Sequence, residues 1–348
     1  MKKLIVIGGG FAGAKIAKKL EGKFDLTLID EKDFFEFTPG ILRSIVKPSH
    51  LKRIESKHKD YLKNSEVIVD SVIKISKEKV VLKDKGEKEF DYLVIASGSK
   101  YRSPIKVKGI LIADRGRKLK AYHNELRVSK KIVIIGGGLV GVELASEIAD
   151  FYGDKKIFIL QKGERIMERN NVKSSEFARG FLENKKVDII CGKEASEYKD
   201  GVVEIKGGER IKCGLVIVCA GISPNSAFMG KGNLDVGGFI MVNEYLQVRE
   251  ELDSCRENVF ACGDVASISE EKTAQGAEKQ ADLVIRNVLA LNNNKPLKKY
   301  KPKKRPMVIS LGRYNGIFEW NNFVLTGIIP ALMKKAIEIK TMMRYKLF

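Results

Sequence analysis

Two glycine-rich segments carry the residues best suited to chemistry in this chain of 348 residues. The first, Gly8-Gly-Gly10-Phe-Ala-Gly13, directly follows the apolar run Leu4 to Ile7. A strand that enters a helix through such a loop can hold a pyrophosphate, because glycine tolerates positive φ, lets the backbone approach the phosphates and allows close packing of helix on strand. Asp30 ends the next apolar run, where its carboxylate can accept hydrogen bonds from an adenosine ribose. The spacing therefore predicts a dinucleotide site.

The second segment, Gly136-Gly-Gly138-Leu-Val-Gly141, repeats the first and follows the apolar run Lys131 to Ile135. Two nucleotide-binding folds are therefore expected in one chain. In such an arrangement one site usually holds a tightly bound flavin and the other a diffusing nicotinamide dinucleotide, because hydride transfer brings the two rings together. Gly263-Asp264 follows another apolar run, and its carboxylate is expected to accept hydrogen bonds from the ribityl hydroxyls of FAD. We therefore expect FAD in the N-terminal fold and NAD(P)H in the second.

These loops need parallel sheets flanked by helices to position them, so the expected fold class is α/β, with two Rossmann-like dinucleotide-binding domains and a C-terminal module. The expected domains are residues 1–110 with 235–305 for FAD, 111–234 for NAD(P)H, and 306–348 for membrane association or dimerisation.

Four weaker patterns connect these parts. The apolar runs 67–75 and 80–83 predict a small antiparallel layer. The basic, polar stretch 99–129 is expected to cross between the domains. An alternating segment from Gly237 predicts a hairpin strand that returns to the first domain.

The net charge of +20 and the pI near 9.5 are typical either of a protein with an anionic partner or of one whose lysines simply solvate its surface. Phosphate-rich cofactors and an acidic membrane surface fit the motifs better than nucleic acid does. The five cysteines form no C-x-x-C pair and the chain starts without a secretory leader, so reduced thiols and a cytoplasmic location are expected. No metal site is expected. No stretch reaches the roughly 18 apolar residues that a spanning helix needs, so membrane contact would be peripheral, at the cytoplasmic face of the cell membrane.

The chain resembles the two-dinucleotide-binding flavoprotein reductases, which have the glutathione-reductase-like FAD/NAD(P) fold of the pyridine nucleotide-disulfide oxidoreductases. Within them it is most similar to type II NADH dehydrogenases and ferroptosis-suppressor-like NAD(P)H:quinone reductases. The resemblance extends over nearly the whole chain and implies an FAD-dependent enzyme that passes hydride from NAD(P)H to flavin and two electrons on to a quinone, without proton pumping. It rests on Gly8–Gly13, Asp30, Phe37-Thr38-Pro39, Ala96-Ser97-Gly98, Gly136–Gly141 with Glu143, Ala220-Gly221, Gly263-Asp264 and residues 274–280.

The resemblance also implies which residues contact each cofactor. For FAD they are Gly8, Gly10, Phe11, Ala12, Gly13, Asp30, Thr38, Pro39, Val72, Ala96, Ser97, Gly98, Gly263, Asp264 and Ala274. For NAD(P)H they are Gly136, Gly138, Leu139, Gly141, Glu143, Gln161, Ala220 and Gly221. Glu143 is placed near both rings, as a catalytic residue that orients the cofactor or relays a proton.

The stretch from Ala274 to Gln280 resembles the A-Q-x-A-x-Q-Q motif, which in type II NADH dehydrogenases lies beside the flavin and lines the quinone tunnel. Gln275 and Gln280 are therefore implied as quinone-site residues, although Lys279 replaces one glutamine of the motif. In the alternative reading, Thr273 caps a helix whose N-terminus faces the flavin and stabilises negative charge there. Both readings can hold together.

Gln161 departs from the dehydrogenase pattern. It ends the second β-run of the second fold, where an NAD-selective enzyme usually carries an acid that binds the ribose 2′-hydroxyl and repels a 2′-phosphate. With an amide there and Lys162 beside it, the sequence leaves NADH and NADPH both open.

The tail from Ile328 to Phe348 predicts a helix with one broad apolar face. This composition favours an interfacial helix whose lysines reach anionic lipids. The alternative is a helix packed on the protein's own flank or in a homodimer. The apolar face comprises Ile329, Leu332, Met333, Ala336, Ile339, Met343 and Leu347, with Lys334, Lys335 and Glu338 opposite.

Three other functions stay open. A sulfide:quinone reductase needs cysteines at the flavin, which Cys191 or Cys262 could supply only by lying against the ring. A soluble ferredoxin or rubredoxin reductase would use the basic charge to bind an acidic partner. A nucleic-acid-binding flavoprotein would show steep salt dependence. A dithiol reductase is disfavoured, because residues 33–48 contain no cysteine.

Overall fold

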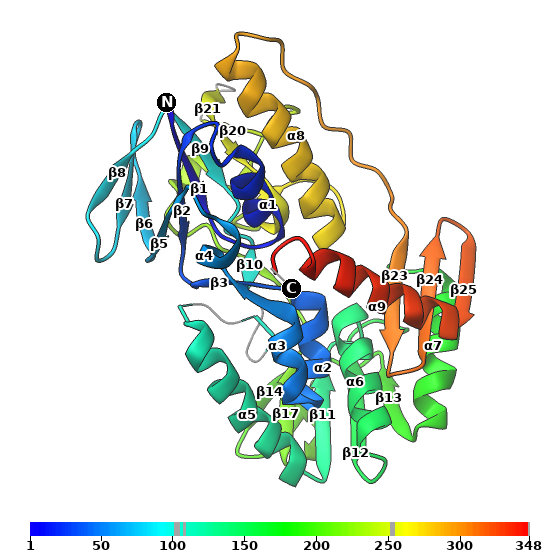
Figure 1. Ribbon diagram of the computed structural model, residues 1–348. Helices are drawn as coiled ribbons and strands as arrows, with labels where there is room; N and C mark the ends of the chain where they lie inside the picture. Colours follow the sequence, from blue (N-terminus) through cyan, green and yellow to red (C-terminus); the bar gives the residue numbers. More distant parts are fainter. Residues whose placement is uncertain (101–104, 107–108, 251–254, 347–348) are drawn as a thin grey trace.

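The computed structural model describes residues 1–100, 105–106, 109–250 and 255–346 (Figure 1). It contains a six-stranded sheet in the order β20-β21-β9-β1-β2-β5 and a four-stranded sheet in the order β13-β12-β11-β17. The two sheets lie towards opposite ends of the molecule, and the C-terminal strands and helix lie to one side of them. The expected α/β class with two Rossmann-like folds is confirmed.

The first sheet is built on strands that are apolar on both faces. β1 (Lys3–Ile7) pairs in parallel with β2 (Asp25–Asp30) and β9 (Tyr92–Ile95), and its apolar residues are all buried. Continuous apolar strands are typical of parallel sheets that are covered on both sides. The cover includes α1 (Phe11–Leu20), which packs against α8 (Ala274–Asn292). The other strands are β5 (Glu66–Val69), β20 (Gln247–Arg249) and β21 (Cys255–Ala261).

The second sheet repeats this plan. β11 (Lys131–Ile135) lies between β12 (Lys156–Gln161) and β17 (Leu215–Val218), and all three run parallel. β12 also pairs with β13 (Val187–Cys191). Each glycine segment therefore joins a central strand to the helix that follows it. In this fold the helices are α6 (Leu139–Phe151), which follows the loop, and α7 (Val172–Asn184).

Short antiparallel layers flank the two sheets. The predicted layer is present as β6 (Val72–Ile75), β7 (Lys79–Leu82) and β8 (Glu87–Glu89). The run 67–75 is not one strand, however, because it divides between β5 of the parallel sheet and β6. A second layer is formed by β14 (Ala195–Lys199), β15 (Val202–Ile205) and β16 (Arg210–Lys212).

The stretch expected to cross between the domains contains a long helix, α5 (Ile112–Val128). The buried stripe of this helix is narrow, since Arg115, Leu119 and Leu126 are its buried residues. Charged residues between them obscure the helical periodicity in the sequence. The predicted hairpin strand from Gly237 is shorter than expected. β19 (Ile240–Met241) pairs in parallel with β22 (Ala266–Ser267), Val242 and Val248 form an antiparallel bridge, and β20 pairs in antiparallel order with β21.

Further short elements connect the two folds near the glycine loops. β10 (Ser99–Lys100) pairs with β18 (Ser223–Pro224). This pair joins the segment that follows β9 of the first fold to the segment that follows β17 of the second. β3 (Phe34–Glu36) pairs with β4 (Glu55–Lys57). The short helices are α2 (Ile41–Val46), α3 (Leu51–Ile54) and α4 (His58–Tyr61), with 3-10 turns at Thr38–Gly40, Pro48–His50, Lys231–Asn233 and Gly263–Val265.

The C-terminal module is a three-stranded meander followed by a helix. β23 (Met307–Leu311), β24 (Asn315–Trp320) and β25 (Phe323–Gly327) pair in antiparallel order, and the predicted tail helix is present as α9 (Ile328–Met342). α9 packs on β23 and β24, and β23 packs on α6. In Figure 1 the segment after α8 runs along the outside of the molecule to β23, so the module returns to cover the second glycine loop's helix.

Candidate functional site

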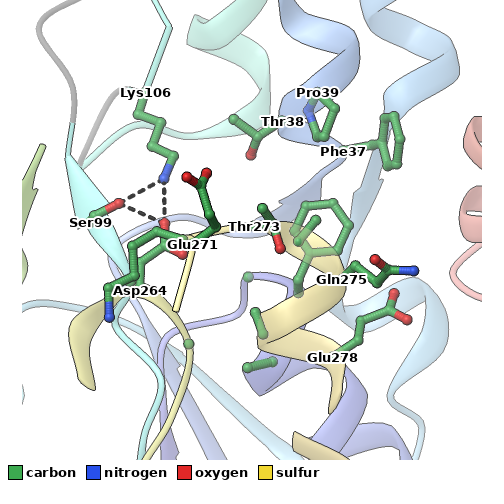
Figure 2. Close-up of a pocket in the computed structure, with 18 of the residues that line it drawn as sticks. Phe37, Thr38, Pro39, Ser99, Lys106, Asp264, Glu271, Thr273, Gln275 and Glu278 are labelled. Carbon is green, nitrogen blue, oxygen red and sulfur yellow. Dashed lines mark hydrogen bonds and ion pairs between the residues drawn. The ribbon is translucent and has the colours of Figure 1, made fainter. Parts of the chain in front are cut away.

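One cavity of about 1120 Å³ lies where four parts of the chain meet. Its lining includes the first glycine loop, the start of α6, the start of α8 and the C-terminal module. Figure 2 shows Ser99, Lys106 and Asp264 on one side of this pocket, with Phe37, Thr38 and Pro39 across from them. The first fold, the second fold and the tail therefore share one cavity.

The residues predicted to hold FAD gather in this cavity almost completely. Gly13 is the exception, because it lies beneath the loop. The predicted residues in the lining are Gly8, Gly10, Phe11, Ala12, Asp30, Thr38, Pro39, Val72, Ala96, Ser97, Gly98, Gly263, Asp264 and Ala274.

The geometry of the first loop explains its glycines. Gly8 has φ +93°, and an added Cβ there would lie 2.5 Å from the Ala96 carbonyl oxygen. At Gly13 an added Cβ would lie 1.8 Å from the Gly8 carbonyl oxygen, so this glycine allows helix α1 to pack on the loop. An added Cβ on Gly10 would meet nothing within 4 Å. The loop is thus open towards the cavity, as a pyrophosphate cradle must be.

Asp264 lies at the end of the returning strand β21 and is already held by two donors. Its Oδ2 accepts hydrogen bonds from Ser99 Oγ at 2.7 Å and from Lys106 Nζ at 2.9 Å (Figure 2). Burial by itself would raise the pKa of Asp264, but the Lys106 ammonium and these hydrogen bonds outweigh burial and hold the pKa below its ordinary range. Asp264 is therefore an anion that can accept hydroxyl hydrogen bonds.

Asp30 ends β2 beside the first loop. Its Oδ2 accepts hydrogen bonds from Gly9 N at 2.9 Å and His58 Nε2 at 3.1 Å, and His58 Nδ1 lies 2.6 Å from the Tyr61 hydroxyl. Burial would raise the pKa of Asp30, but the hydrogen bond and charge of His58, with Lys32 and Gly9, lower it. Hydrogen bonding thus fixes Oδ2 between the loop and α4.

The second loop has the same backbone form. Gly136 has φ +107°, and an added Cβ on Gly141 would lie 1.9 Å from the Gly136 carbonyl oxygen. An added Cβ on Gly138 would meet nothing within 4 Å. Gly137 N donates to Gln161 Oε1 at 2.8 Å, so the amide takes the place that Asp30 occupies in the first fold.

The residues predicted for NAD(P)H divide into two groups. Leu139 and Glu143 line the cavity. The others belong to the loop and to strand ends on the side of the second sheet and do not line the cavity: Gly136, Gly138, Gly141, Gln161, Ala220 and Gly221. On the second fold, the cavity therefore reaches the first turns of α6 and a few residues such as Arg169, but not the turn of the glycine loop.

Glu143 is tied to the C-terminal module. Its Oε1 accepts hydrogen bonds from Ser310 N at 2.8 Å, Ser310 Oγ at 3.0 Å and Lys334 Nζ at 2.9 Å. Lys334 also lines the cavity. This corrects one detail of the expected tail helix: Lys334, expected among the lysines that reach anionic lipids, is bound to Glu143 instead. Glu338 lies 3.1 Å from His50 Nε2, because these charged side chains find partners on the body of the protein.

The two glutamines of the 274–280 stretch have different surroundings. Thr273 caps α8 by accepting a hydrogen bond from Gly276 N at 3.0 Å, and Gln275 on the first turn lines the cavity. Gln280 is buried, and its Oε1 accepts from Gly263 N at 2.6 Å while its Nε2 donates to Glu270 at 2.6 Å. In this geometry Gln280 positions the turn that carries Asp264 and is not part of the cavity lining.

The five cysteines, all within the described part of the chain, are absent from the cavity lining. Cys262 is fully buried, and burial raises its pKa to about 12. Cys191 lies on β13, where Arg179 Nη2 contacts its Sγ at 3.3 Å. Neither cysteine that could have supported sulfide chemistry is therefore placed at the cavity.

Sequence reasoning missed three residues of the site. Ser99 directly follows the predicted Gly98, so its position was an available signal. The sequence carries no signal for Lys106 or Ser310. Lys106 contacts Asp264 and Ser310 contacts Glu143, and both partners lie far away along the chain.

Comparison with known proteins agrees with this geometry. A family model described as pyridine nucleotide-disulphide oxidoreductase matches residues 2–281. Apoptosis-inducing factor homolog B of Dictyostelium discoideum is 30% identical, with 96% of this chain and 94% of that protein covered. Ferroptosis suppressor protein 1 of Xenopus tropicalis is also 30% identical, with 95% and 92% covered.

Solved structures show the same fold. NDH2 from Plasmodium falciparum in complex with NADH has a TM-score of 0.82 at 16% identity, covering 98% of this chain and 94% of that one. The sulfide:quinone oxidoreductase from Aquifex aeolicus has a TM-score of 0.81 at 18% identity, covering 99% and 91%.

Two dinucleotide folds that face one cavity define a flavoprotein oxidoreductase. The chain belongs to the pyridine nucleotide-disulphide oxidoreductase family, and its cofactors are FAD and NAD(P)H. The expected family and cofactors are thereby confirmed. The open, glycine-lined cradle at Gly8 to Gly10 and the anionic Asp264 fit FAD.

Proposed function

We propose that this chain is an NAD(P)H:quinone oxidoreductase that does not pump protons. The observation that carries the proposal is the shared cavity, which joins the FAD loop to the start of α6 and to the C-terminal module. A donor bound at α6 and an acceptor that enters beside α9 would both reach this space. The relatives fit the reaction, since NDH2 was solved with NADH and another neighbour is named a sulfide:quinone oxidoreductase.

The proposal keeps the expected division of the chain. Residues 1–110 and 235–305 bind FAD, residues 111–234 bind NAD(P)H, and residues 306–348 attach the enzyme to a membrane. The cofactor contacts proposed from the sequence keep their roles. Gln280, which was expected in the quinone site, is proposed instead as a residue that positions the turn at Gly263.

Bound FAD would supply the redox chemistry, by taking hydride from NAD(P)H and passing two electrons to the acceptor. The chain positions the reactants and stabilises charge. The N-terminus of α8 presents backbone N–H groups and the positive end of its dipole to the cavity, which favours negative charge there. Lys334 Nζ, held by Glu143, can deliver a proton to an acceptor oxygen, and Gln275 can donate a hydrogen bond to it.

The tail helix supports peripheral attachment at the cytoplasmic face of the cell membrane. Ile329 and Leu332 are 55% and 58% exposed, whereas Lys334 and Glu338 turn inward, so α9 shows its apolar side to the surroundings. Trp320 and Phe323 on the neighbouring hairpin are also exposed. In the described chain, no helix combines the length and hydropathy needed to span a bilayer. An apolar face beside exposed Lys335 and Lys340 suits an anionic membrane surface.

The acceptor is tested by steady-state turnover with NADH and a soluble quinone, in parallel with sulfide and a ferredoxin. Gln275→Leu should lower turnover with quinone by about tenfold, from one lost hydrogen bond in the cavity, and leave reduction of the flavin by NADH unchanged. Arg286→Gln is the matched control, because Arg286 is exposed on the same helix and lies outside the cavity lining. Turnover with ferredoxin or sulfide alone would refute the quinone proposal.

Membrane attachment is tested by flotation with anionic vesicles. The double substitution Ile329→Glu and Leu332→Glu should release the protein, while Val172→Glu, an equally exposed apolar position on α7, should not. Unchanged flotation of the double variant would refute the interfacial helix. If the double variant changes from dimer to monomer while its flotation with vesicles is unchanged, the apolar face of α9 binds a second copy of the chain instead.

A further inference from the structure

Gln161 does not by itself determine whether the second fold prefers NADH or NADPH. Gln161 ends β12, at the position where an acid normally reads the adenosine ribose. Its Oε1 is already used by Gly137 N at 2.8 Å. A neutral amide in this place cannot repel a 2′-phosphate.

A carboxylate from the following loop lies beside this amide. Glu168 Oε1 accepts a hydrogen bond from Glu164 N at 3.0 Å, and Glu168 Oε2 lies 3.4 Å from Gln161 Nε2. The carboxylate rests against Gly163, where an added Cβ would lie 1.9 Å from Oε1. Glycine at this position leaves room for the carboxylate, and a side chain there would displace it.

The loop that carries Glu168 is fixed to the second glycine loop. Met167 N donates to the Gly137 carbonyl at 2.8 Å. Arg165 binds three carbonyl groups of its own loop, those of Met167 at 3.2 Å, Glu168 at 2.6 Å and Asn170 at 2.9 Å. The position of the carboxylate is therefore set by the fold, although the side chain itself is exposed.

The nearby cations have other contacts. The η nitrogens of Arg165 bind the loop carbonyls, and Lys162 pairs with Glu194 at 3.2 Å. Arg169 lines the main cavity, on the α6 side. A 2′-phosphate at the end of β12 would thus meet the Glu168 carboxylate beside these engaged cations.

We infer that Glu168 supplies the carboxylate that accepts hydrogen bonds from the adenosine ribose of the nicotinamide dinucleotide, so that this chain prefers NADH to NADPH. An ionised carboxylate has about four lone-pair sites, so Glu168 can keep its two contacts and still accept from ribose hydroxyls. The same charge repels a 2′-phosphate. The inference rests on the proposed nucleotide site at β11 and α6, and is independent of the acceptor.

The test measures binding without electron transfer. FAD-loaded protein is titrated calorimetrically with ADP-ribose and with 2′-phospho-ADP-ribose, which both lack the nicotinamide. The wild type should bind ADP-ribose at least about tenfold more tightly. Glu168→Gln should weaken ADP-ribose binding, strengthen binding of the phosphorylated ligand, and shrink the ratio by about tenfold or more. Glu164→Gln, in the same loop, should leave the ratio unchanged.

A second variant reaches the same carboxylate indirectly. Gly163→Ala displaces the Glu168 side chain without altering its charge. Like Glu168→Gln, it should reduce the preference for ADP-ribose over 2′-phospho-ADP-ribose. Retained flavin absorbance and an unchanged melting temperature confirm that both variants fold. A wild-type preference for the phosphorylated ligand, no binding of either ligand, or an unchanged ratio in Glu168→Gln would each overturn the inference. None of these results depends on quinone turnover.

Discussion

The two glycine loops have nearly the same backbone and different surroundings. Gly8 and Gly136 both have positive φ. Gly13 packs against the Gly8 carbonyl, and Gly141 packs in the same way against the Gly136 carbonyl. Beside the first loop, a carboxylate accepts from Gly9 and is held by the buried His58. Beside the second, an amide accepts from Gly137 and meets an exposed carboxylate.

This difference separates a retained cofactor from an exchanging one. The first loop lines the cavity together with Asp30 and Asp264, and the buried residues His58 and Ser99 hydrogen-bond to these two carboxylates. The second loop contributes only the start of α6 to that cavity. A ligand enclosed by the first fold should dissociate slowly, whereas one bound at the open second fold can leave after each turnover.

The largest expected effect comes from a matched pair of loop substitutions. Gly13→Ala and Gly141→Ala each place a Cβ within 2 Å of a backbone oxygen, which should cost about 3 kcal/mol of folding free energy. Gly13→Ala should yield colourless protein, whereas Gly141→Ala should keep its flavin but lose reduction by NADH. Absorbance spectra and denaturant unfolding measure both. Gly180→Ala on α7, where an added Cβ meets nothing within 4 Å, should be neutral or stabilising, and equal flavin loss in both loop variants would contradict the division of roles.

Asp264→Asn should cost about 2 kcal/mol and weaken FAD retention, because Lys106 loses this carboxylate. The pKa of Asp264 is depressed in the folded state, so its stabilisation is present above the unfolded value and is lost as pH falls through the folded value. Wild type and variant should therefore converge in stability at low pH. Urea unfolding at pH 7 and at pH 3 measures this, and a pH-independent difference would exclude the charge as its cause.

Glu55→Gln tests the buried charges of the first fold. Burial raises the pKa of Glu55 to about 8, helped by Glu36 across the strand pair and opposed by Arg115. A raised carboxyl pKa means that stability is greatest below the unfolded value and falls as pH rises towards 8. The variant should therefore be more stable than wild type at pH 9, by at least about 2 kcal/mol, and similar at pH 4. Thermal melting across pH measures this; the exposed Glu176→Gln of the second fold should follow wild type throughout.

His58→Phe should have the smallest effect, about 1 to 2 kcal/mol, since it removes the hydrogen bonds to Asp30 and to the Tyr61 hydroxyl but leaves the one from Gly9 to Asp30 in place. FAD should dissociate several times faster while the affinity for ADP-ribose at the second fold stays the same. The rate of flavin release after dilution reports on the first fold, and calorimetry with ADP-ribose reports on the second. Weaker ADP-ribose binding without faster flavin release would reverse the assignment of the folds.

Much of this fold could be predicted because its signals are local. The apolar strands before Gly8 and Gly136 and the glycine spacing after them fix strand, loop and helix within one short segment. The predicted FAD residues gather in one cavity for the same reason, since they sit at the carboxyl ends of neighbouring strands.

The remainder depends on contacts between distant segments. The inward turn of Lys334 is set by Glu143 on another fold, and helical periodicity alone placed this lysine on the outer, charged side. Gln280 matched a motif, but its buried contact with Gly263 depends on how α8 meets β21. α5 was missed as a helix because its narrow buried stripe is interrupted by charge.

Anaerobic titration of the purified, flavin-containing protein with NADH, followed by a soluble quinone, tests the central claim most directly. The account predicts that NADH bleaches the flavin absorbance stoichiometrically and that quinone restores it. A preparation that takes up no flavin, or a flavin that NADH leaves oxidised, would contradict two cooperating nucleotide folds.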